Sequence, residues 1–307
     1  MPTEVPADTP GCSPDAAFAA VGNETRIQIL RALGEADGPL TFSALHDATD
    51  YNSSSNFAYH LDRLTDQFIK TDGDGYQLTS AGRRIVEAIH SGAITETPRV
   101  DRTPVDIPCH FCGGVVEVRY AEERLERFCT ECEGMWGSQP DGFLGALSLP
   151  PVGLQHRTLD EAVKAAWLWQ QRDLFSIAAR LCPRCSDRLD HELLVCEDHS
   201  QAGDRCPACS NRYAASLRFA CHTCGFGGTG SLPLILLDQL AMMRFFVDQR
   251  LHPVQPDSIT DYHRIVSDYE ETVRSVAPPE VVLTFRWADA SISFLIEADL
   301  TVTQRTA

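Results

Sequence analysis

Eleven of the twelve cysteines stand in closely spaced pairs, a pattern that suits metal binding. Two residues separate the partners in each of five Cys-x-x-Cys pairs, and Cys196 and His199 form a sixth, Cys-x-x-His pair. A tight turn can aim both side chains of such a pair at one ion, about 2.3 Å from each sulfur in the case of zinc. The five cysteine pairs are Cys109/Cys112, Cys129/Cys132, Cys182/Cys185, Cys206/Cys209 and Cys221/Cys224. The spacing therefore predicts zinc binding and leaves only Cys12 outside the pattern.

Twelve ligands are enough for three four-coordinate zinc sites. Two glycines, Gly113 and Gly225, directly follow the second cysteine of a pair, where the backbone often needs a positive φ. An interleaved, cross-brace pairing of the last four pairs is an alternative to pairing in sequence order. Sequence order predicts the sets Cys109, Cys112, Cys129 and Cys132; Cys182, Cys185, Cys196 and His199; and Cys206, Cys209, Cys221 and Cys224.

We expect this zinc to be structural rather than redox-active or catalytic. Disulfides are rare in cytosolic proteins, and no thioredoxin-like βαβ pattern surrounds any of the pairs. A catalytic zinc usually keeps three protein ligands and an open position, whereas each predicted site here has four ligands. The sequence also offers no Ser-His-Asp set, no phosphate-binding loop and no pair of carboxylates placed by a motif. We therefore expect no enzyme.

The charge composition is acidic, with a formal net charge of -17 and only two lysines, Lys70 and Lys164, among 26 basic residues. This composition resembles that of proteins from salt-loving archaea; an acidic protein from a GC-rich genome is the alternative. Molar salt would screen the repulsion of an acidic protein from nucleic acid within about 3 Å. The longest apolar run, near Leu232–Leu237, is too short to span a bilayer, and the first fourteen residues lack a signal sequence. We expect a soluble, cytoplasmic protein without a membrane partner.

The first quarter of the chain has the pattern of a small helical domain with a hairpin. We expect a helix over 15–33, a short helix over 42–48 with Thr41 as N-cap, and a second helix over 53–68. The apolar residues of that last helix follow one face. They are Phe57, Leu61, Leu64 and Phe68. Two short strands around residues 72–75 then predict a hairpin, and Thr79 or Ser80 opens a final helix. This order predicts a winged helix-turn-helix.

Several segments here resemble ArsR-like transcription regulators. The stretch 21–30, VGNETRIQIL, looks like the first helix of that family, and 56–64, NFAYHLDRL, is similar to its recognition helix. The whole arrangement, including GYQLTSAG at 75–82, resembles haloarchaeal ArsR-like proteins with a Cys-rich C-terminal half. The resemblance implies DNA binding by the second helix of the motif. It does not imply metal sensing, because no cysteine lies between Cys12 and Cys109.

The second helix of such a motif enters the major groove, where Asn can bond adenine and Arg can bond guanine. Residues outside its apolar stripe, together with two arginines that begin the last helix, are the candidate DNA contacts. They are Ser55, Asn56, Tyr59, Arg63, Arg83 and Arg84. An ordinary solvated helix face is the alternative. The region 13–97 has six basic and twelve acidic residues, with Asp72 and Asp74 at the wing tip, which disfavours DNA at ordinary salt.

The rest of the chain predicts strands at 115–120 and 124–128, a loop over 137–153, helices over 159–181 and 232–250, and a closing hairpin around residues 288–290. The fold class is predicted as α+β: an N-terminal winged helix-turn-helix followed by zinc-ribbon modules combined with two long helices and a terminal β-hairpin. The expected parts are a disordered tail (1–14), the winged helix-turn-helix domain (15–94), a linker (95–108), a first zinc ribbon (109–136) and a composite domain (137–307) with zinc sites at 182–199 and 206–224.

These patterns favour a DNA-binding transcription regulator. Helix-turn-helix proteins commonly bind paired half-sites, so we expect a homodimer on double-stranded DNA. The zinc-bearing half would dimerise, sense a signal or contact the transcription machinery. The alternative is a zinc-stabilised interaction adaptor whose winged helix binds protein rather than DNA, and the acidic wing favours that alternative.

Overall fold

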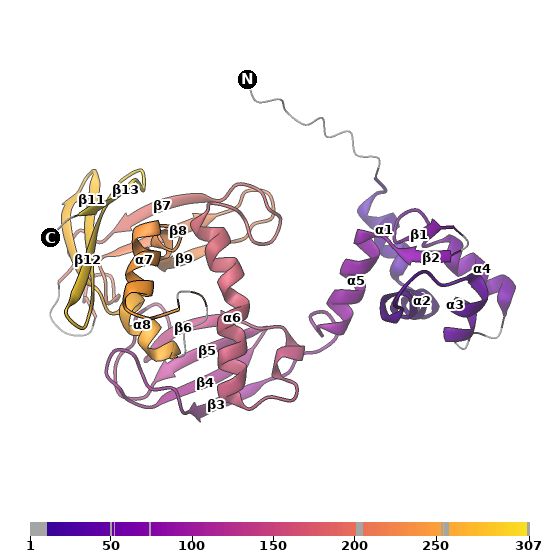
Figure 1. The fold of residues 1–307 in the computed structure, drawn as a ribbon, viewed down its shortest axis with the longest axis horizontal. Coiled ribbons are helices and arrows are strands. Elements are labelled where there is room, and N and C mark those ends of the chain that lie inside the picture. The colour runs from indigo at the N-terminus through magenta and orange to yellow at the C-terminus, as the bar shows by residue number, and fades with distance from the viewer. Residues whose placement is uncertain are drawn as a thin grey trace, which may run out of the picture. The chain divides into compact units, whose positions relative to one another are not determined.

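The computed structural model describes residues 11–49, 51, 53–73, 75–200, 205–252, 254 and 258–305. The fold is a mixture of helices and antiparallel sheets, as the α+β prediction requires. The chain divides into two compact units, Met1–Glu96 and Thr97–Ala307, and Figure 1 shows the elements of each. No helix within the described part of the chain is long and apolar enough to cross a membrane.

The first unit has five helices and one hairpin among its described residues. Its apolar core includes Phe57, Leu61, Leu64 and Phe68, the stripe predicted from the helical spacing. Thr41 and Thr79 each accept a hydrogen bond from the backbone three residues on, so both act as helix N-caps. The elements are α1 (Pro14–Val21), α2 (Glu24–Glu35), α3 (Phe42–Ala48), α4 (Ser54–Asp62), β1 (Ile69–Asp72), β2 (Gly75–Leu78) and α5 (Ser80–His90).

Two predicted helices of this unit were too long. The helix expected over 15–33 is α1 and α2, because Asn23 leaves the helical conformation and accepts a hydrogen bond from the Arg26 amide at 3.3 Å. The helix expected over 53–68 ends at Asp62. The chain then turns through Asp66, whose φ of 70° lies in the left-handed region, and Phe68 still enters the core.

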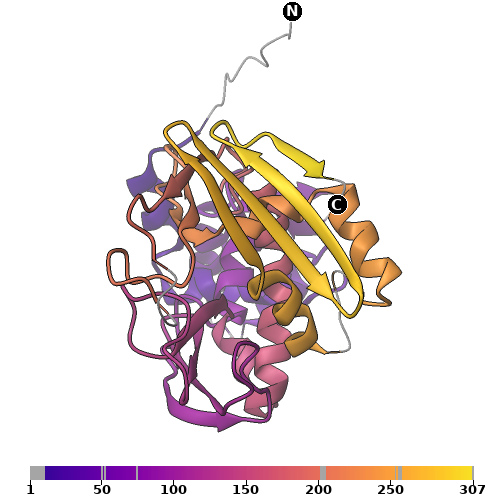
Figure 2. The same ribbon diagram turned by 90° about the vertical axis from the view of Figure 1, so that its left-hand side faces the viewer.

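The second unit contains three antiparallel sheets that share one apolar core. Figure 1 shows α6 running from the β3–β6 sheet to the β7–β9 sheet, and Figure 2 shows the β10–β13 sheet face on. The sheets comprise β3 (Val100–Val105), β4 (Val116–Ala121), β5 (Arg124–Cys129) and β6 (Phe143–Ser148); β7 (Asp190–Val195), β8 (Ala215–Ala220) and β9 (Gly227–Ser231); and β10 (Glu270–Val276), β11 (Pro279–Trp287), β12 (Ala290–Glu297) and β13 (Val302–Arg305).

The helical elements of this unit pack among the sheets. Trp167 of α6 and Phe246 of α7 are both buried in the common core, and they flank the ring of Tyr262 from α8. Met242 and Phe245 are buried as well, so the Met/Phe-rich helix α7 packs in the core. The elements are η1 (Pro151–Leu154), α6 (Leu159–Ala178), η2 (Leu232–Leu236), α7 (Leu240–Asp248) and α8 (Ile259–Ser267).

Four expectations for this half need correction. The linker expected over 95–108 contains β3, which pairs with β4, and the loop expected over 137–153 contains β6. The helix expected over 232–250 is broken into η2 and α7 at Leu237–Gln239. The closing hairpin is formed by β11 and β12, but it lies inside a four-stranded sheet. The sequences of the two outer strands, β10 and β13, show no clear alternation of apolar and polar residues.

Candidate metal centres

Three groups of four side chains bring their ligand atoms to within 4.8 Å of one another, and each group could hold a metal ion. All twelve are residues predicted from the spacing. The first group is the predicted first set. The other eight residues combine differently from the prediction. The groups are Cys109, Cys112, Cys129 and Cys132; Cys182, Cys185, Cys221 and Cys224; and Cys196, His199, Cys206 and Cys209.

The last four pairs are nested, so both the sequence-order pairing and the cross-brace alternative were wrong. The reason lies in β7 and β8, which pair antiparallel with Asp190 opposite Ala220 and Val195 opposite Ala215. The pair before β7 therefore meets the pair after β8 at one end of the hairpin. At the other end, the pair after β7 meets the pair before β8. A candidate metal-binding group thus lies at each end of the β7–β8 hairpin.

Four of the Cys-x-x-Cys turns share one backbone pattern. At Cys109, the amide donates to the Gly114 carbonyl at 2.9 Å, and the Gly113 amide donates back to the Cys109 carbonyl at 2.8 Å. The turns that begin at Cys182, Cys206 and Cys221 repeat both bonds. The residue after the second cysteine has a positive φ in all four. These residues are Gly113 (80°), Ser186 (64°), Ser210 (60°) and Gly225 (74°).

The distances between sulfur atoms fit the tetrahedral coordination of one ion and are too long for disulfide bonds. Cys109 and Cys132 lie 3.8 Å apart between sulfurs, Cys112 and Cys129 3.5 Å, and Cys182 and Cys224 3.6 Å. Four sulfurs placed tetrahedrally at about 2.3 Å from a zinc ion would be separated by about 3.8 Å. A disulfide would require about 2.05 Å. In the mixed group, His199 Nδ1 lies 3.4 Å from the sulfur of Cys209.

Backbone amides around the thiols favour the deprotonated form that a metal ion requires. The amides of Cys209 and Ser200 lower the pKa of Cys206 to about 7. Burial raises the pKa of Cys182, but donors from Cys185 and Arg184 overcome it and bring the pKa to about 7. Burial lowers the pKa of His199, so its ring is neutral and can donate a lone pair. The second and third groups thus each contain one thiol with a pKa near neutral, whereas the pKa of Cys185 is raised to about 12 and that of Cys209 to about 11.

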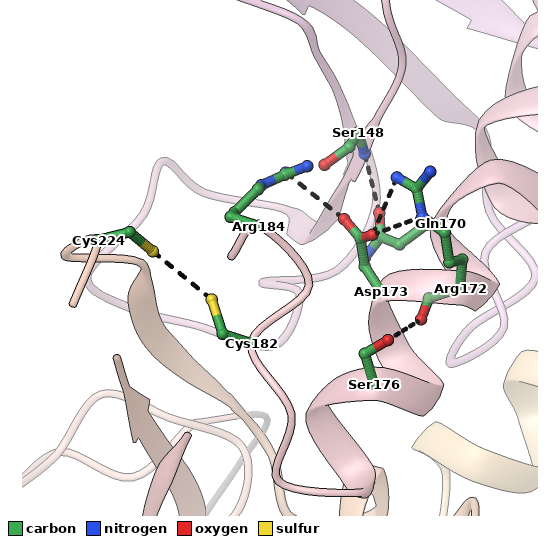
Figure 3. Close-up of polar contacts among 8 residues, drawn as sticks. All are labelled: Ser148, Gln170, Arg172, Asp173, Ser176, Cys182, Arg184 and Cys224. Atoms are coloured by element: carbon green, nitrogen blue, oxygen red, sulfur yellow. Dashed lines mark hydrogen bonds and ion pairs between the residues drawn. The ribbon is translucent and has the colours of Figure 1, made fainter. Parts of the chain in front are cut away.

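The second group is tied to helix α6 by an ion pair that sequence analysis missed. Arg184, between the ligands Cys182 and Cys185, lies 3.4 Å from the carboxylate of Asp173, and Arg172 approaches the same carboxylate at 3.2 Å. Figure 3 shows the two guanidinium groups reaching Asp173 beside the Cys182–Cys224 contact. Asp173 is buried although it is charged. Its only sequence signal is a carboxylate within an otherwise amphipathic helix, which is too common to single it out.

The six candidate DNA contacts all lie on the surface of the first unit. Ser55, Asn56 and Tyr59 project from α4, Arg63 follows its last turn, and Arg83 and Arg84 lie in the first turn of α5. The Tyr59 side chain is 56% exposed, whereas Phe57 and Leu61 on the opposite side are buried. Asn56 donates to the Tyr51 hydroxyl at 2.8 Å, which orients the amide. Asp72 is exposed on the hairpin, and Asp74 lies outside the described residues.

Two parts of the chain match models of families that are described only as domains of unknown function. Residues 14–89 match the model of the domain of unknown function DUF7347. No curated protein and no solved structure matches the chain. Residues 106–302, which contain all three metal-binding groups, match the model of the domain of unknown function DUF7351. Since that match covers more than half of the sequence, the chain belongs to the DUF7351 family.

Proposed function

We propose that this chain is a transcription regulator of ArsR-like winged-helix type that binds double-stranded DNA through α4. The observation that carries the proposal is the two-sided character of α4. Phe57 and Leu61 fix one side in the core, while Asn56 and Tyr59 stand exposed on the other. A short helix precedes α4 and a two-stranded hairpin follows it, which is the order of a winged helix-turn-helix. A helix held in this way can present its polar side chains to base edges.

We further propose that the three metal-binding groups hold structural zinc. Two of the groups offer four sulfur ligands, and the third offers three sulfurs and a histidine nitrogen. Closed, four-coordinate sites of both kinds are typical of structural zinc. Zinc bound at both ends of the β7–β8 ribbon would stabilise a ribbon that has few core residues of its own. The zinc-bearing half would serve in homodimerisation, signal sensing or contact with the transcription machinery. The acidic composition fits a cytoplasm of high salt, where DNA repulsion is screened.

The test is selection of genomic DNA fragments by the zinc-loaded protein in molar KCl. A Tyr59→Ala/Arg63→Ala double variant removes two exposed side chains of the proposed interface. Arg31→Ala is the matched control, because Arg31 is an exposed arginine of α2 outside that interface. We expect selective enrichment by the wild type and the control and its loss in the double variant. Equal enrichment by all three proteins would contradict the role of α4.

The acidic hairpin supports a second candidate function, a zinc-stabilised adaptor whose first unit binds a protein. Asp72 is exposed where a DNA-binding wing usually carries Arg or Lys. In this case the wild type would enrich no DNA at any salt concentration. Crosslinking from the Asp72 position would then capture a partner protein in cells, and the Asp72→Arg variant would lose that partner.

A further inference from the structure

The second unit encloses an arginine that no carboxylate among the described residues neutralises. Arg127 lies on β5, its side chain is buried, and its Nε atom has no hydrogen-bond partner within the described part of the chain. Its NH1 group lies 3.1 Å from Nε2 of His263. Among the described residues, the one group that would offset its charge is the sulfur of Cys109, a candidate metal ligand, in its thiolate form. A guanidinium stays charged in proteins, so burial without a paired acceptor is costly.

Two histidines complete the polar surroundings of this arginine. His110 and His263 stack with their ring centres 5.2 Å apart, and both are buried. The Nε2 atom of His110 has no partner among the described residues. Arg212 and Arg264 also act electrostatically on His110. Both of these arginines also act on the carboxylate of Asp268, so Arg127 is the guanidinium of this set that lacks a described carboxylate partner.

A cavity lies against these groups. Arg127, His110 and His263 line it together with Thr260, and the remaining wall is apolar. The empty space is about 280 Å³ when its open side is counted, but its enclosed inner part has room for only one small group. Apolar walls lower the local dielectric and strengthen any charge interaction inside. The apolar wall is formed by Val105, Ile107, Pro108, Val116, Leu144 and Val163.

We propose that this cavity binds one small monovalent anion, of the size of a halide or formate, between Arg127 and the two histidines. The guanidinium would supply the charge and the free N–H donor, and the ring nitrogens would supply further polar contacts. The small inner space excludes nucleotides and sugar phosphates. The site lies beside the first metal-binding group, since His110 follows Cys109 in sequence, but it uses none of the four ligands. This inference does not depend on the proposed DNA binding.

Bromide is the probe for the crystallographic test, because its anomalous scattering distinguishes it from water. The full-length, metal-loaded protein is crystallised without halide and soaked in bromide. We expect one anomalous peak within hydrogen-bond distance of the Arg127 guanidinium. Water alone at that place would overturn the proposal. The thiolates of the first metal-binding group would then be the groups that balance the positive charge of Arg127.

A solution test uses two matched variants of the same strand. Arg127→Met removes the charge at similar volume, and Arg124→Met does the same at an exposed position of β5. Thermal unfolding is followed against bromide or formate concentration, with potassium gluconate keeping the ionic strength constant. We expect a saturable rise of Tm in the wild type and in Arg124→Met, and at least about tenfold weaker binding in Arg127→Met. Identical curves for all three proteins would show a general salt effect and overturn the proposal.

Discussion

Arg184 lies between two candidate metal ligands, Cys182 and Cys185, and its guanidinium is paired at 3.4 Å with the buried carboxylate of Asp173 on α6. The side chain of Asp173 is only 6% exposed, and Arg172 is its second partner. The turn that carries Cys182 and Cys185 is therefore fixed both by its own backbone hydrogen bonds and by a helix from another part of the fold.

We expect Asp173→Ala to destabilise the second unit by about 1–3 kcal/mol, because two arginines lose their acceptor at a buried position. Urea denaturation of the metal-loaded protein measures the change. Competition with a chelator should also release metal from the second group faster than in the wild type. Glu192→Gln is the control, because it breaks an exposed ion pair between Glu192 on β7 and Arg218 on β8. This substitution should have little effect on stability. Equal effects of the two substitutions would contradict the anchoring role of Asp173.

The nested grouping predicts the metal content of double cysteine variants. Cys182 and Cys224 belong to one group, so Cys182→Ser/Cys224→Ser should lose one metal ion per chain. Cys182→Ser/Cys196→Ser removes ligands from two groups and should lose two. Native mass spectrometry or elemental analysis of the purified proteins counts the ions. The opposite result would support pairing in sequence order, in which Cys182 and Cys196 share an ion.

Glu271 predicts a pH dependence of stability. Its carboxylate accepts hydrogen bonds from the amides of Ala214 and Ala215, at 2.6 and 3.1 Å, but burial raises its pKa to about 7. The folded state then binds more protons than the unfolded state, so this contribution is present below about pH 4.5 and is lost as the pH rises through 7. Between pH 6 and 8 the loss should amount to about 1.4 kcal/mol.

Glu271→Gln provides the comparison for that titration, because glutamine has no proton to lose. Urea denaturation at pH 6, 7 and 8 with zinc in excess would show a stability difference between wild type and variant that changes across this range. A stability difference that stays constant from pH 6 to 8 would contradict the predicted titration of Glu271 in this pH range.

The N-cap of α2 is a test of the first unit. Asn23→Ala removes the acceptor for the Arg26 amide and should cost about 1 kcal/mol. Ser53 occupies the N-cap position of α4 without a side-chain cap bond, so Ser53→Ala should cost less. Thermal unfolding of both variants measures the two costs. A larger loss of stability from Ser53→Ala than from Asn23→Ala would contradict the predicted stabilisation of α2 by its N-cap.

The features predicted correctly from the sequence are those set by near neighbours. The two-residue spacing correctly predicted turns that bring both ligand atoms of a pair into one four-residue group, and the spacing of Phe57 and Leu61 correctly predicted the buried side of α4. The grouping of the last four pairs depends on the distant strands β7 and β8, and only their antiparallel register decides it. Arg127 was not a candidate because arginines are rarely buried, and its hydrogen-bond partner His263 lies on α8, 136 residues away.

The central claim is that the exposed side of α4 recognises bases. The most direct measurement is selection from a randomised duplex pool in molar KCl, with the wild type, Asn56→Ala and Arg83→Ala/Arg84→Ala. We expect Asn56→Ala to lose the sequence preference at one or two positions of the selected motif, whereas the arginine variant should keep the motif and bind every sequence more weakly. A motif that is identical for the wild type and Asn56→Ala, or no motif for the wild type, would contradict the claim.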